Sequence, residues 1–472
     1  RARFGEDIIN HYTYVLASDG DIQEPVALGS AQLAGHYKLN KLIVFYDNNR
    51  IQISGHTSRA DSTDIKKMFE SFNWRVVEID GHDHEDIRRE IELARKQEEA
   101  PTIIIGKTIM SKGSTKYEGM HEYHGMPFPA EEVEAIKRSF GFPEGVSFYL
   151  PEDAISHFRV RFNDLKKEIE EWEYRKKLKL ENDNQFKELW EALNRGFYKD
   201  LQTPKFSEGE KIATRVAFGN ILSEFYHQIP FLIGGSADLE PSNNTAEFAK
   251  KAKDFTYQYR EGRNLVFGVR EFPMGTIING IALHSGLRSF GATFLVFSDY
   301  ERGALRLSAL MGLPVLHVFT HDSFFVGEDG PTHQPIEHVF SLRAIPNMVV
   351  IRPADAKETV GAMQYAMEET NKPVSLILTR QNLPVLQETN PNLVKKGAYI
   401  VKGSENEKPD IIVIATGSEV SLALEVAEKL GANVRVISMP SFELFEQQEE
   451  EYKEKILPSD VENRVSIEAG ST

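Results

Sequence analysis

Residues 13–49, TYVLASDGDIQEPVALGSAQLAGHYKLNKLIVFYDNN, decide the fold class. This stretch begins with a short apolar run, Thr13 to Ala17, and closes on a near-continuous apolar run, Lys41 to Tyr46. Between them, Pro25 to Ala34 repeats small and apolar residues at helical spacing. Apolar strands without alternation, joined in about 30 residues through a helix, are typical of a buried parallel sheet. The stretch therefore predicts a βαβ unit, with Ser18 to Asp21 as a turn after its first strand.

The alternation of strand and helix continues along the chain. A helix is expected at Glu85–Lys96, and charge-dense helices bridging two domains are expected from about 160 to 193. Asp355 and Glu358 have the spacing of a capping box at the start of a later helix. The further strands that we expect are Trp74–Ile79, Thr102–Thr108, Phe231–Gly234, Val315–Phe319, Met348–Ile351, Val374–Leu378, Ile411–Ala415, Val434–Ser438 and Val465–Glu468. This pattern predicts an α/β protein made of three doubly wound domains.

Composition narrows the classes of function. The 472 residues carry 55 Lys and Arg against 71 Asp and Glu, a formal net charge of −16. That charge argues against nonspecific binding to a nucleic-acid backbone, and no apolar run is long enough to span a bilayer. The sequence has no cysteine, which excludes disulfides, thiolate nucleophiles and cysteine-ligated metals. We therefore expect a cytoplasmic enzyme without a nucleic-acid or membrane partner.

Two polar residues of the first region are candidate metal ligands. Asp19 and Asn49 each come just past the carboxyl end of a predicted parallel strand, where ligands bind in open α/β sheets. A carboxylate, an amide oxygen and a backbone carbonyl suit a hard cation such as Mg²⁺. Asp-Gly and Asn-Asn are also common turn residues, so an ordinary loop is the alternative.

The second region holds three candidate binding elements. Residues 234–243, GGSADLEPSN, follow a strand directly and either let the backbone approach an anion or form a flexible connection. In GVREFPM, Glu271 lies among apolar neighbours, where a desolvated carboxyl can share a proton with a ring nitrogen; a surface ion pair is the alternative. Phe294, Phe297 and Tyr300 form either an aromatic platform or a stripe in the core.

A dense polar cluster lies beyond the predicted strand Val315–Phe319. Residues 320–335 contain two histidines and three acids, which favours acid–base chemistry or the recognition of hydroxyl groups. Arg215 and Arg380 could each clamp a phosphate through two parallel hydrogen bonds, and a surface salt bridge is the alternative for both.

At this point the sequence resembles the transketolases, thiamin-diphosphate-dependent enzymes of the pentose phosphate pathway. The likeness runs over essentially the whole chain and is most specific in GGSADLEPSN, GVREFPM, THDSFFVGEDGPTHQP and LTRQN. It implies a diphosphate-binding domain with a helical linker at its end (1–185), a pyrimidine-binding domain (186–398) and a C-terminal domain (399–472). It also implies a homodimer with cofactor sites between subunits. The implied reaction moves a two-carbon ketol unit reversibly from a ketose phosphate such as xylulose 5-phosphate to an aldose phosphate such as ribose 5-phosphate.

The resemblance also implies roles for individual residues. Asp19, Asn49 and the carbonyl of Ile51 are expected to hold Mg²⁺ (or Ca²⁺ or Mn²⁺) bound to the cofactor diphosphate. The expected catalytic residues are Glu271, which bonds the aminopyrimidine and favours the imino form that generates the ylide, together with His333 and His124. The further expected cofactor contacts are Asp19, Gly20, His124, Asp238, Phe294, Phe297 and Tyr300. The expected substrate contacts are Arg215, Ser242, His321, Asp329, Arg380 and His124.

The sequence departs from the family pattern at three positions of its diphosphate motif. Ser18 and Pro25 stand where the family usually has glycine, and Gly29 stands where it usually has a second glutamate. The family also has further chain before Arg1 and beyond Thr472, so we expect incomplete first and last domains and weak cofactor binding by these residues alone. A noncatalytic homologue is one alternative. Another thiamin-dependent enzyme, such as dihydroxyacetone synthase or deoxyxylulose-phosphate synthase, is the other.

Overall fold

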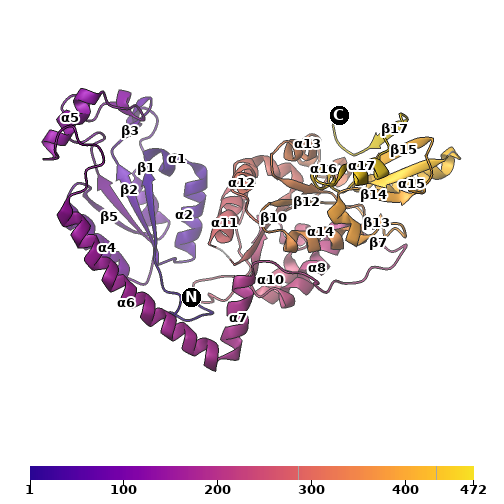
Figure 1. The fold of residues 1–472 in the computed structure, drawn as a ribbon, viewed down its shortest axis with the longest axis horizontal. Coiled ribbons are helices and arrows are strands. Elements are labelled where there is room, and N and C mark those ends of the chain that lie inside the picture. Colours follow the sequence, from indigo (N-terminus) through magenta and orange to yellow (C-terminus); the bar gives the residue numbers. More distant parts are fainter. Residues whose placement is uncertain (285, 432, 472) are drawn as a thin grey trace. The chain divides into compact units, whose positions relative to one another are not determined.

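The computed structural model describes residues 1–284, 286–431 and 433–471. Two compact units make up the chain, and each is described by itself. The first comprises Arg1–Lys187 and Thr256–Arg260, and the second comprises Glu188–Phe255 and Glu261–Thr472. In Figure 1 the first unit is mostly indigo to magenta and the second runs from pink to yellow.

A four-stranded parallel sheet forms the centre of the first unit. Its order is β1 (Thr13–Ser18), β2 (Leu42–Asn48), β6 (Thr102–Lys107) and β5 (Arg75–Asp80). The predicted βαβ unit is therefore confirmed, but its first strand is not buried: β1 lies at the edge of the sheet and Leu16 is 85% exposed. The strand bounds differ from the predicted ones by one or two residues, because the polar residues at the strand ends still pair with their neighbours.

Helices cover both faces of this sheet. Helices α2 (Pro25–His36) and α3 (Ile65–Ser71) share a core with one face, and α4 (His84–Lys96) packs on the other. Figure 1 shows α2 and α4 on opposite sides of the sheet. The indole nitrogen of Trp74 donates to the carbonyl of Ala31 over 2.9 Å, which ties the start of β5 to α2.

The predicted turn at Ser18 to Asp21 is wrong. Asp19 begins a short helix, α1 (Asp19–Gln23), and both the backbone nitrogen and the hydroxyl of Ser18 donate to the Asp21 carboxylate over 2.8 Å. Pro25 is the first residue of α2, where proline is favoured because its missing N–H would have no partner inside the helix. The carboxyl end of β1 therefore leads directly into a helix that starts with Asp19.

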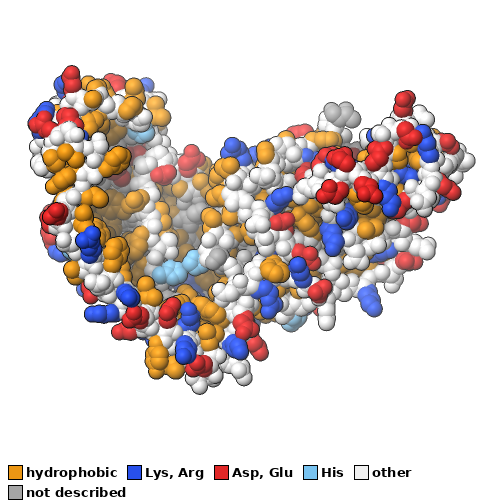
Figure 2. Space-filling view, in the orientation of Figure 1, with side chains coloured by type: hydrophobic (Ala, Val, Ile, Leu, Met, Phe, Trp, Pro, Cys, Tyr) orange, Lys and Arg blue, Asp and Glu red, His pale blue; other side chains and the backbone are white. Residues whose placement is uncertain are grey.

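Two helices, α6 (Glu152–Asn182) and α7 (Asn184–Arg195), confirm the predicted charge-dense helical region. Apolar side chains such as Phe158 and Phe162 are exposed along α6, and Figure 2 shows orange side chains among the charged ones on this helix. No helix in the described ranges combines the length and hydropathy needed to cross a membrane. The remaining elements of the first unit are β3 (Ile51–Gln52), β4 (Gly55–His56), η1 (Thr57–Arg59), η2 (His121–Tyr123) and α5 (Ala130–Ser139).

A five-stranded parallel sheet forms the larger core of the second unit. Its order is β11 (Val349–Ile351), β12 (Val374–Leu378), β10 (Val315–Thr320), β9 (Arg288–Phe294) and β8 (Leu232–Ser236). The predicted set of strands lacked β9. All seven of its residues are buried although it starts with Arg-Ser, and the Arg288 guanidinium donates to the carbonyl of Met367 over 3.2 Å.

Helices enclose this sheet on both faces. Helices α8 (Thr214–Gln228), α10 (Ala246–Ala252) and α14 (Ala356–Glu368) contribute to the core on one face. Helices α12 (Ser298–Leu310) and α13 (His338–Arg343) pack on the other. The remaining elements of this region are β7 (Lys211–Ile212), α9 (Glu240–Asn243), α11 (Glu271–Leu283), η3 (Leu295–Phe297), η4 (Phe324–Val326), η5 (Pro331–His333), β13 (Leu383–Pro384) and η6 (Pro391–Lys396).

A second sheet of the same unit has the order β14 (Tyr399–Lys402), β16 (Val434–Ser438), β15 (Ile411–Ala415) and β17 (Arg464–Ile467). Strand β14 is antiparallel to β16, an edge pairing absent from the prediction, and the other pairs are parallel. The helices that accompany this sheet are α15 (Glu419–Leu430), α16 (Phe442–Glu446) and α17 (Glu450–Ile456).

The predicted cap at Asp355 and Glu358 connects these two regions. Asp355 Oδ1 accepts from the backbone nitrogen of Glu358 over 2.9 Å, as expected of an N-cap. The reciprocal bond of a capping box is not formed, because the Glu358 carboxylate accepts from the nitrogen of Ala354 and not of Asp355, and also from the hydroxyl of Tyr399, both over 2.7 Å. Glu358 therefore bonds the start of α14 to strand β14.

Candidate functional site

Asp19 is the centre of the polar cluster on the first unit. Its side chain is buried, and its two oxygens accept from the hydroxyl of Tyr46 over 2.7 Å and from the backbone nitrogen of Arg50 over 2.9 Å. Burial raises the pKa of the Asp19 carboxyl, and the neighbouring Asp47 adds to that rise. The hydrogen bonds from Tyr46 and Arg50 and the charge of Arg50 act in the opposite direction and favour the carboxylate, and a bound cation would favour it further.

The turn after β2 supplies the other oxygen atoms. Arg50 has a φ of 61°, in the left-handed region, and this reversal carries its backbone nitrogen to Asp19. Asn49 Oδ1 accepts from the nitrogen of Ile51 over 2.9 Å, which orders the turn. Carboxylate, amide and backbone carbonyl oxygens are the donors that Mg²⁺ prefers. The oxygen atoms of Asp19 and of this turn are therefore of the chemical type that a magnesium ion binds.

A cavity of about 320 Å³ opens beside Asp19. Its walls are mostly polar, and they include Gln23, Tyr46, Asn48, Arg50, Ser58, Asp61, Thr63 and Lys66. His124 is exposed and is not among the described residues that line this cavity. Gly20 is exposed on α1, and a Cβ there would meet no atom within 4 Å. The structure therefore brings Asp19 to the backbone of Arg50, in the same turn as Asn49 and Ile51, while Asn49, Ile51 and His124 are not among the described residues that line the cavity.

The other candidate residues lie on the second unit, at the carboxyl ends of its parallel strands. Strand β8 leads to Asp238 and α9, β9 ends at Phe294, β10 leads to His321 and β12 leads to Arg380. In open α/β sheets this edge is where ligands bind. Asp238 and Asp329 are both exposed.

His321 is the best-connected member of this cluster. Its ring lies 3.8 Å from the ring of Phe294, centroid to centroid, and its Nδ1 is 2.8 Å from the hydroxyl of Thr320. Burial, followed by the positive charges of Arg215 and Arg380, lowers the pKa of His321 to about 3. The imidazole is therefore neutral at neutral pH and has one donor and one acceptor nitrogen.

Arg215 lies beside His321, and one nitrogen of its guanidinium has no hydrogen-bond partner in the described part of the chain. Its Nη1 donates to the carbonyl of Ser242 over 2.7 Å and lies 3.4 Å from His321 Nε2. Its Nε is buried and has no hydrogen-bond partner within the described ranges. Burial and Arg380 lower the pKa of Arg215, and Arg380 itself donates to the exposed Glu328 over 2.8 Å. Two neighbouring guanidinium groups with an unsatisfied N–H suit an anion.

Glu271 and an aromatic group form the rest of the cluster. Glu271 is the first residue of α11 and is 9% exposed, and burial raises the pKa of its carboxyl. Phe294 and Phe297 stack with ring centroids 5.7 Å apart and planes at 4°, while Tyr300 is 67% exposed. Phe294 itself is buried at 7% exposed and Phe297 is half-buried, so this aromatic platform is part of the core at its Phe294 end and accessible at its Tyr300 end. A buried carboxyl with a raised pKa and aromatic rings on the same unit are groups that a planar nitrogen heterocycle such as the pyrimidine of thiamin would use.

His333 is half-buried and its ring lies 5.4 Å from that of Phe297.

Asn243 has a more important role than the sequence indicated. Its side chain accepts from the hydroxyl of Ser236 and donates to the hydroxyl of Thr320, both over 2.7 Å. It thus links the end of β8 to the residue before His321. Only its position in the GGSADLEPSN stretch signalled it.

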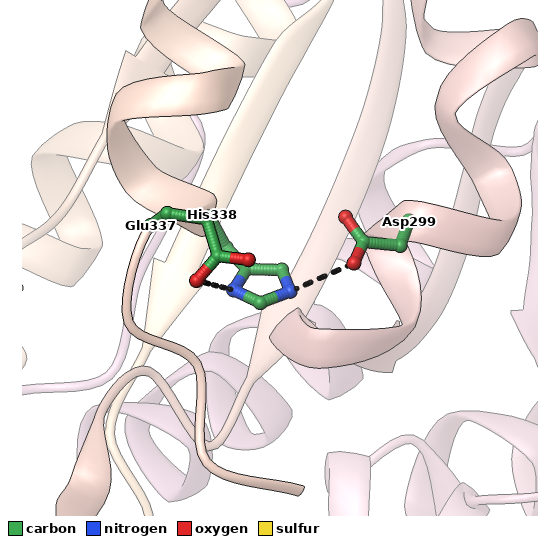
Figure 3. A group of neighbouring side chains, drawn as sticks. All are labelled: Asp299, Glu337 and His338. Atoms are coloured by element: carbon green, nitrogen blue, oxygen red, sulfur yellow. Dashed lines mark hydrogen bonds and ion pairs between the residues drawn. The ribbon is translucent and has the colours of Figure 1, made fainter. Parts of the chain in front are cut away.

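Another histidine, His338, is held between two carboxylates (Figure 3). Its Nε2 lies 3.2 Å from Asp299 Oδ2, and its Nδ1 lies 3.9 Å from Glu337 Oε2. Both carboxylates are largely exposed, while the imidazole is buried. Because each carboxylate approaches a different ring nitrogen, we interpret the group as a tie between α12 and α13.

Comparisons with known proteins agree along the whole chain. Residues 1–196 match the family described as transketolase, thiamine diphosphate binding domain. Residues 210–385 match transketolase, pyrimidine binding domain, and residues 397–472 match transketolase-like TK C-terminal domain.

Individual relatives give the same result. A transketolase of Bacillus subtilis is 44% identical over 99% of this chain, which spans 71% of that protein. A transketolase of Aquifex aeolicus is 43% identical over 99% of this chain and 68% of its own length. Among solved structures, a transketolase from Leishmania mexicana superposes with a TM-score of 0.95 at 37% identity, covering 100% of this chain and 70% of that one. A Pichia stipitis transketolase in complex with sedoheptulose-7-phosphate has the same TM-score at 38% identity, covering 100% and 71%.

Proposed function

This chain belongs to the transketolase family, and from that premise we propose that it transfers a two-carbon ketol unit from a ketose phosphate to an aldose phosphate. Xylulose 5-phosphate and ribose 5-phosphate are the donor and acceptor that we propose. The observation that best supports sugar phosphates as substrates is the group formed by Arg215, His321 and Arg380, with the unsatisfied Nε of Arg215 among them.

Thiamin diphosphate and Mg²⁺ are the cofactors of this proposal. Asp19, Asn49 and the carbonyl of Ile51 would hold the metal ion at the diphosphate. Glu271 and the aromatic platform would hold the pyrimidine. When bound, the cofactor supplies an electron sink that allows a carbon–carbon bond next to a ketose carbonyl to break and form.

The chain's own groups would bind and orient the substrate and move protons. Glu271, whose raised pKa favours the protonated carboxyl, can donate a hydrogen bond to a ring nitrogen. The neutral His321 can accept from one sugar hydroxyl and donate to another. Arg215 and Arg380 would grip the phosphate, with the Ser242 carbonyl orienting Arg215. His333, which faces the edge of Phe297, is the proposed proton carrier. We keep Gly20, Asp238, His124 and Asp329 in the proposed site on the basis of the family resemblance alone.

The remaining parts of the proposal concern the assembly. We propose a homodimer, in which the first unit of one copy and the second unit of another complete each cofactor site. We also propose three domains at 1–185, 186–398 and 399–472. A cytoplasmic location and a place in the pentose phosphate pathway belong to the same proposal and rest on the family. Light scattering of the purified protein tests the dimer, and a monomer at micromolar concentration would contradict it.

The central test is an exchange assay with the full-length protein. Xylulose 5-phosphate and ribose 5-phosphate are supplied with and without thiamin diphosphate and Mg²⁺, and the seven-carbon ketose phosphate product is measured. We expect product only when both cofactors are present. A full-length protein that gives no cofactor-dependent exchange would contradict the proposed function.

A noncatalytic homologue is the second candidate, because Ser18, Pro25 and Gly29 depart from the family pattern. The local structure accommodates the first two. Ser18 bonds to Asp21, and Pro25 starts α2 without displacing Asp19 from its contact with Arg50. Calorimetric titration of the full-length protein with thiamin diphosphate separates the two candidates. Metal-dependent binding supports the enzyme, and no binding supports the noncatalytic homologue.

A further inference from the structure

A buried group of charges connects the loop of His321 to the C-terminal region of the second unit. Arg352 follows β11 and its side chain is fully buried. Its Nε and Nη2 both donate to Asp322 Oδ2, over 2.9 Å and 2.7 Å. Its Nη1 donates to the carbonyl of Thr416 over 2.8 Å and to the carboxylate of Glu419. One guanidinium thus joins residues that are far apart in the sequence.

Within the β10 region, the Arg352 guanidinium contacts Asp322, the residue next to His321. Asp322 directly follows His321, is 1% exposed and accepts from the hydroxyl of Ser323 over 3.3 Å. His321 has a φ of 62°, a left-handed conformation that costs free energy for a residue with a Cβ. Such a conformation persists only where the surrounding structure holds it. Two hydrogen bonds from Arg352 onto the next side chain contribute to that hold, together with the contacts of His321 with Phe294 and Thr320.

Residues 416–419 of the C-terminal region surround the rest of the Arg352 guanidinium. Glu419, the first residue of α15, also accepts from the backbone nitrogen of Ala469 over 3.1 Å. A Cβ added to Gly417 would lie 2.7 Å from Arg352 side-chain atoms, so the backbone approaches the guanidinium closely. The Ser418 hydroxyl accepts from Nη2 over 3.1 Å. All three nitrogens of the Arg352 guanidinium therefore have hydrogen-bond partners.

We propose that Arg352 is a positioning residue for the reaction: by anchoring Asp322 to residues 416–419, it holds His321 where the imidazole can read the hydroxyl groups of the donor sugar. The inference rests on the proposed function of His321 as a substrate contact. Arg352 itself touches neither the substrate site nor the cofactor candidates Glu271 and Asp19. Its loss should therefore weaken the binding of a hydroxylated donor and leave cofactor binding unchanged.

The test uses Arg352→Lys in the full-length holoenzyme. Lysine keeps the charge, but its single ammonium cannot reach Asp322, Thr416 and Glu419 together. We expect the KM for xylulose 5-phosphate to rise about tenfold while kcat stays within about threefold. The KM for hydroxypyruvate, a donor without the later sugar hydroxyls, should stay within about twofold. The affinity for thiamin diphosphate should also be unchanged.

Arg435→Lys is the matched control for losing a buried arginine. Arg435 is 1% exposed in the same C-terminal region, and it donates to the carbonyls of Ser404, Glu407, Lys455 and Ile456. It has no contact with the His321 loop in these bonds. We expect Arg435→Lys to lower the melting temperature while leaving both donor KM values at the wild-type level.

Hydrogen exchange gives a readout that does not depend on activity. The peptide that covers residues 316–326 should exchange faster in Arg352→Lys than in the wild type or in Arg435→Lys. Asp322→Asn, which weakens the same anchor from the loop side, should show the same two effects and replaces Arg352→Lys if that variant does not fold. A wild-type KM together with wild-type exchange in the folded variant would overturn the proposal. So would an equal rise of both donor KM values. If the wild-type protein has no transfer activity, the proposed function fails, and the exchange rates still decide whether Arg352 holds the loop.

Discussion

Replacing Glu358 with glutamine should remove one pH dependence from the stability of the second unit. The carboxyl is fully buried and accepts from the backbone of Ala354 and from the hydroxyl groups of Tyr399 and Ser438. Burial raises the pKa of Glu358 from 4.5 to about 7, and the neighbouring Asp355 adds to the rise. The folded protein therefore binds this proton more tightly than the unfolded chain does.

The size of this contribution to the free energy of unfolding follows from the difference between the folded-state and unfolded-state pKa of Glu358. A shift from 4.5 to about 7 is about 2.5 pKa units, and one unit corresponds to about 1.36 kcal/mol, so the proton contributes about 3 kcal/mol of stability. This contribution is fully present below pH 4.5 and is lost as the pH rises through about 7. Glutamine carries no titrating proton. The free energy of unfolding of the wild type, minus that of Glu358→Gln, should fall by about 3 kcal/mol between pH 4.5 and pH 8.

Urea unfolding at several pH values across this window, followed by circular dichroism, measures that difference. Other titrating groups are the same in both proteins, so they cancel in the subtraction to the extent that they are uncoupled from position 358. Glu425→Gln, at an exposed position on α15, is the control and should show a pH-independent difference. A pH-independent difference for Glu358→Gln would refute the reasoning, because it would mean that Glu358 titrates alike in the folded and unfolded chains.

Three further predictions concern the proposed site in the full-length protein. Tyr46→Phe removes one of the two donors to Asp19 and should weaken thiamin diphosphate binding with Mg²⁺ by about 10- to 100-fold in calorimetric titration; unchanged affinity would contradict the metal site. Glu271→Gln should lower kcat for ketol transfer by roughly 10²- to 10⁴-fold in the exchange assay, and wild-type turnover would exclude the proposed role. Arg215→Lys should raise the KM for phosphorylated donors by about 10-fold, in keeping with the loss of charge-assisted hydrogen bonds, and the KM for an unphosphorylated ketose much less. Equal increases would exclude a phosphate grip.

The sequence predicts the apolar strands of this fold well. Strands β12 and β15 have their predicted bounds because each is a short, mostly apolar run in a sheet, and β16 was found by its Val434, Val436 and Ile437 although it contains the buried Arg435. Strand β9 was missed because it begins with Arg288-Ser289 and has Gly291 at its centre, so it contains no apolar run. The Arg288 guanidinium bonds the carbonyl of Met367, and the Ser289 hydroxyl bonds that of Ile278. Such partners come from distant parts of the chain, and no local pattern reveals them.

The same distinction holds for the candidate site. Positions just past strand ends were predictable, and the structure gathers Arg215, His321 and Phe294 there. The properties of those groups were not predictable. The depressed pKa of His321 and the unsatisfied Nε of Arg215 depend on burial by elements far apart in the sequence. His124 was assigned to the site by its sequence motif alone, and in the structure its side chain is exposed.

The left-handed backbone of His321 has a consequence for protein engineering. A library of all residues at position 321 would test two requirements at once, the chemistry of the side chain and the ability to adopt a φ of 62°. Glycine, asparagine and aspartate meet the second requirement most easily, whereas valine and isoleucine meet it poorly whatever the substrate. Selection for a new donor specificity would thus enrich residues for their backbone tolerance. Asn and Gly should therefore be screened first at position 321, and new side-chain chemistry should be introduced at neighbouring positions. This order separates the backbone requirement from the chemical one.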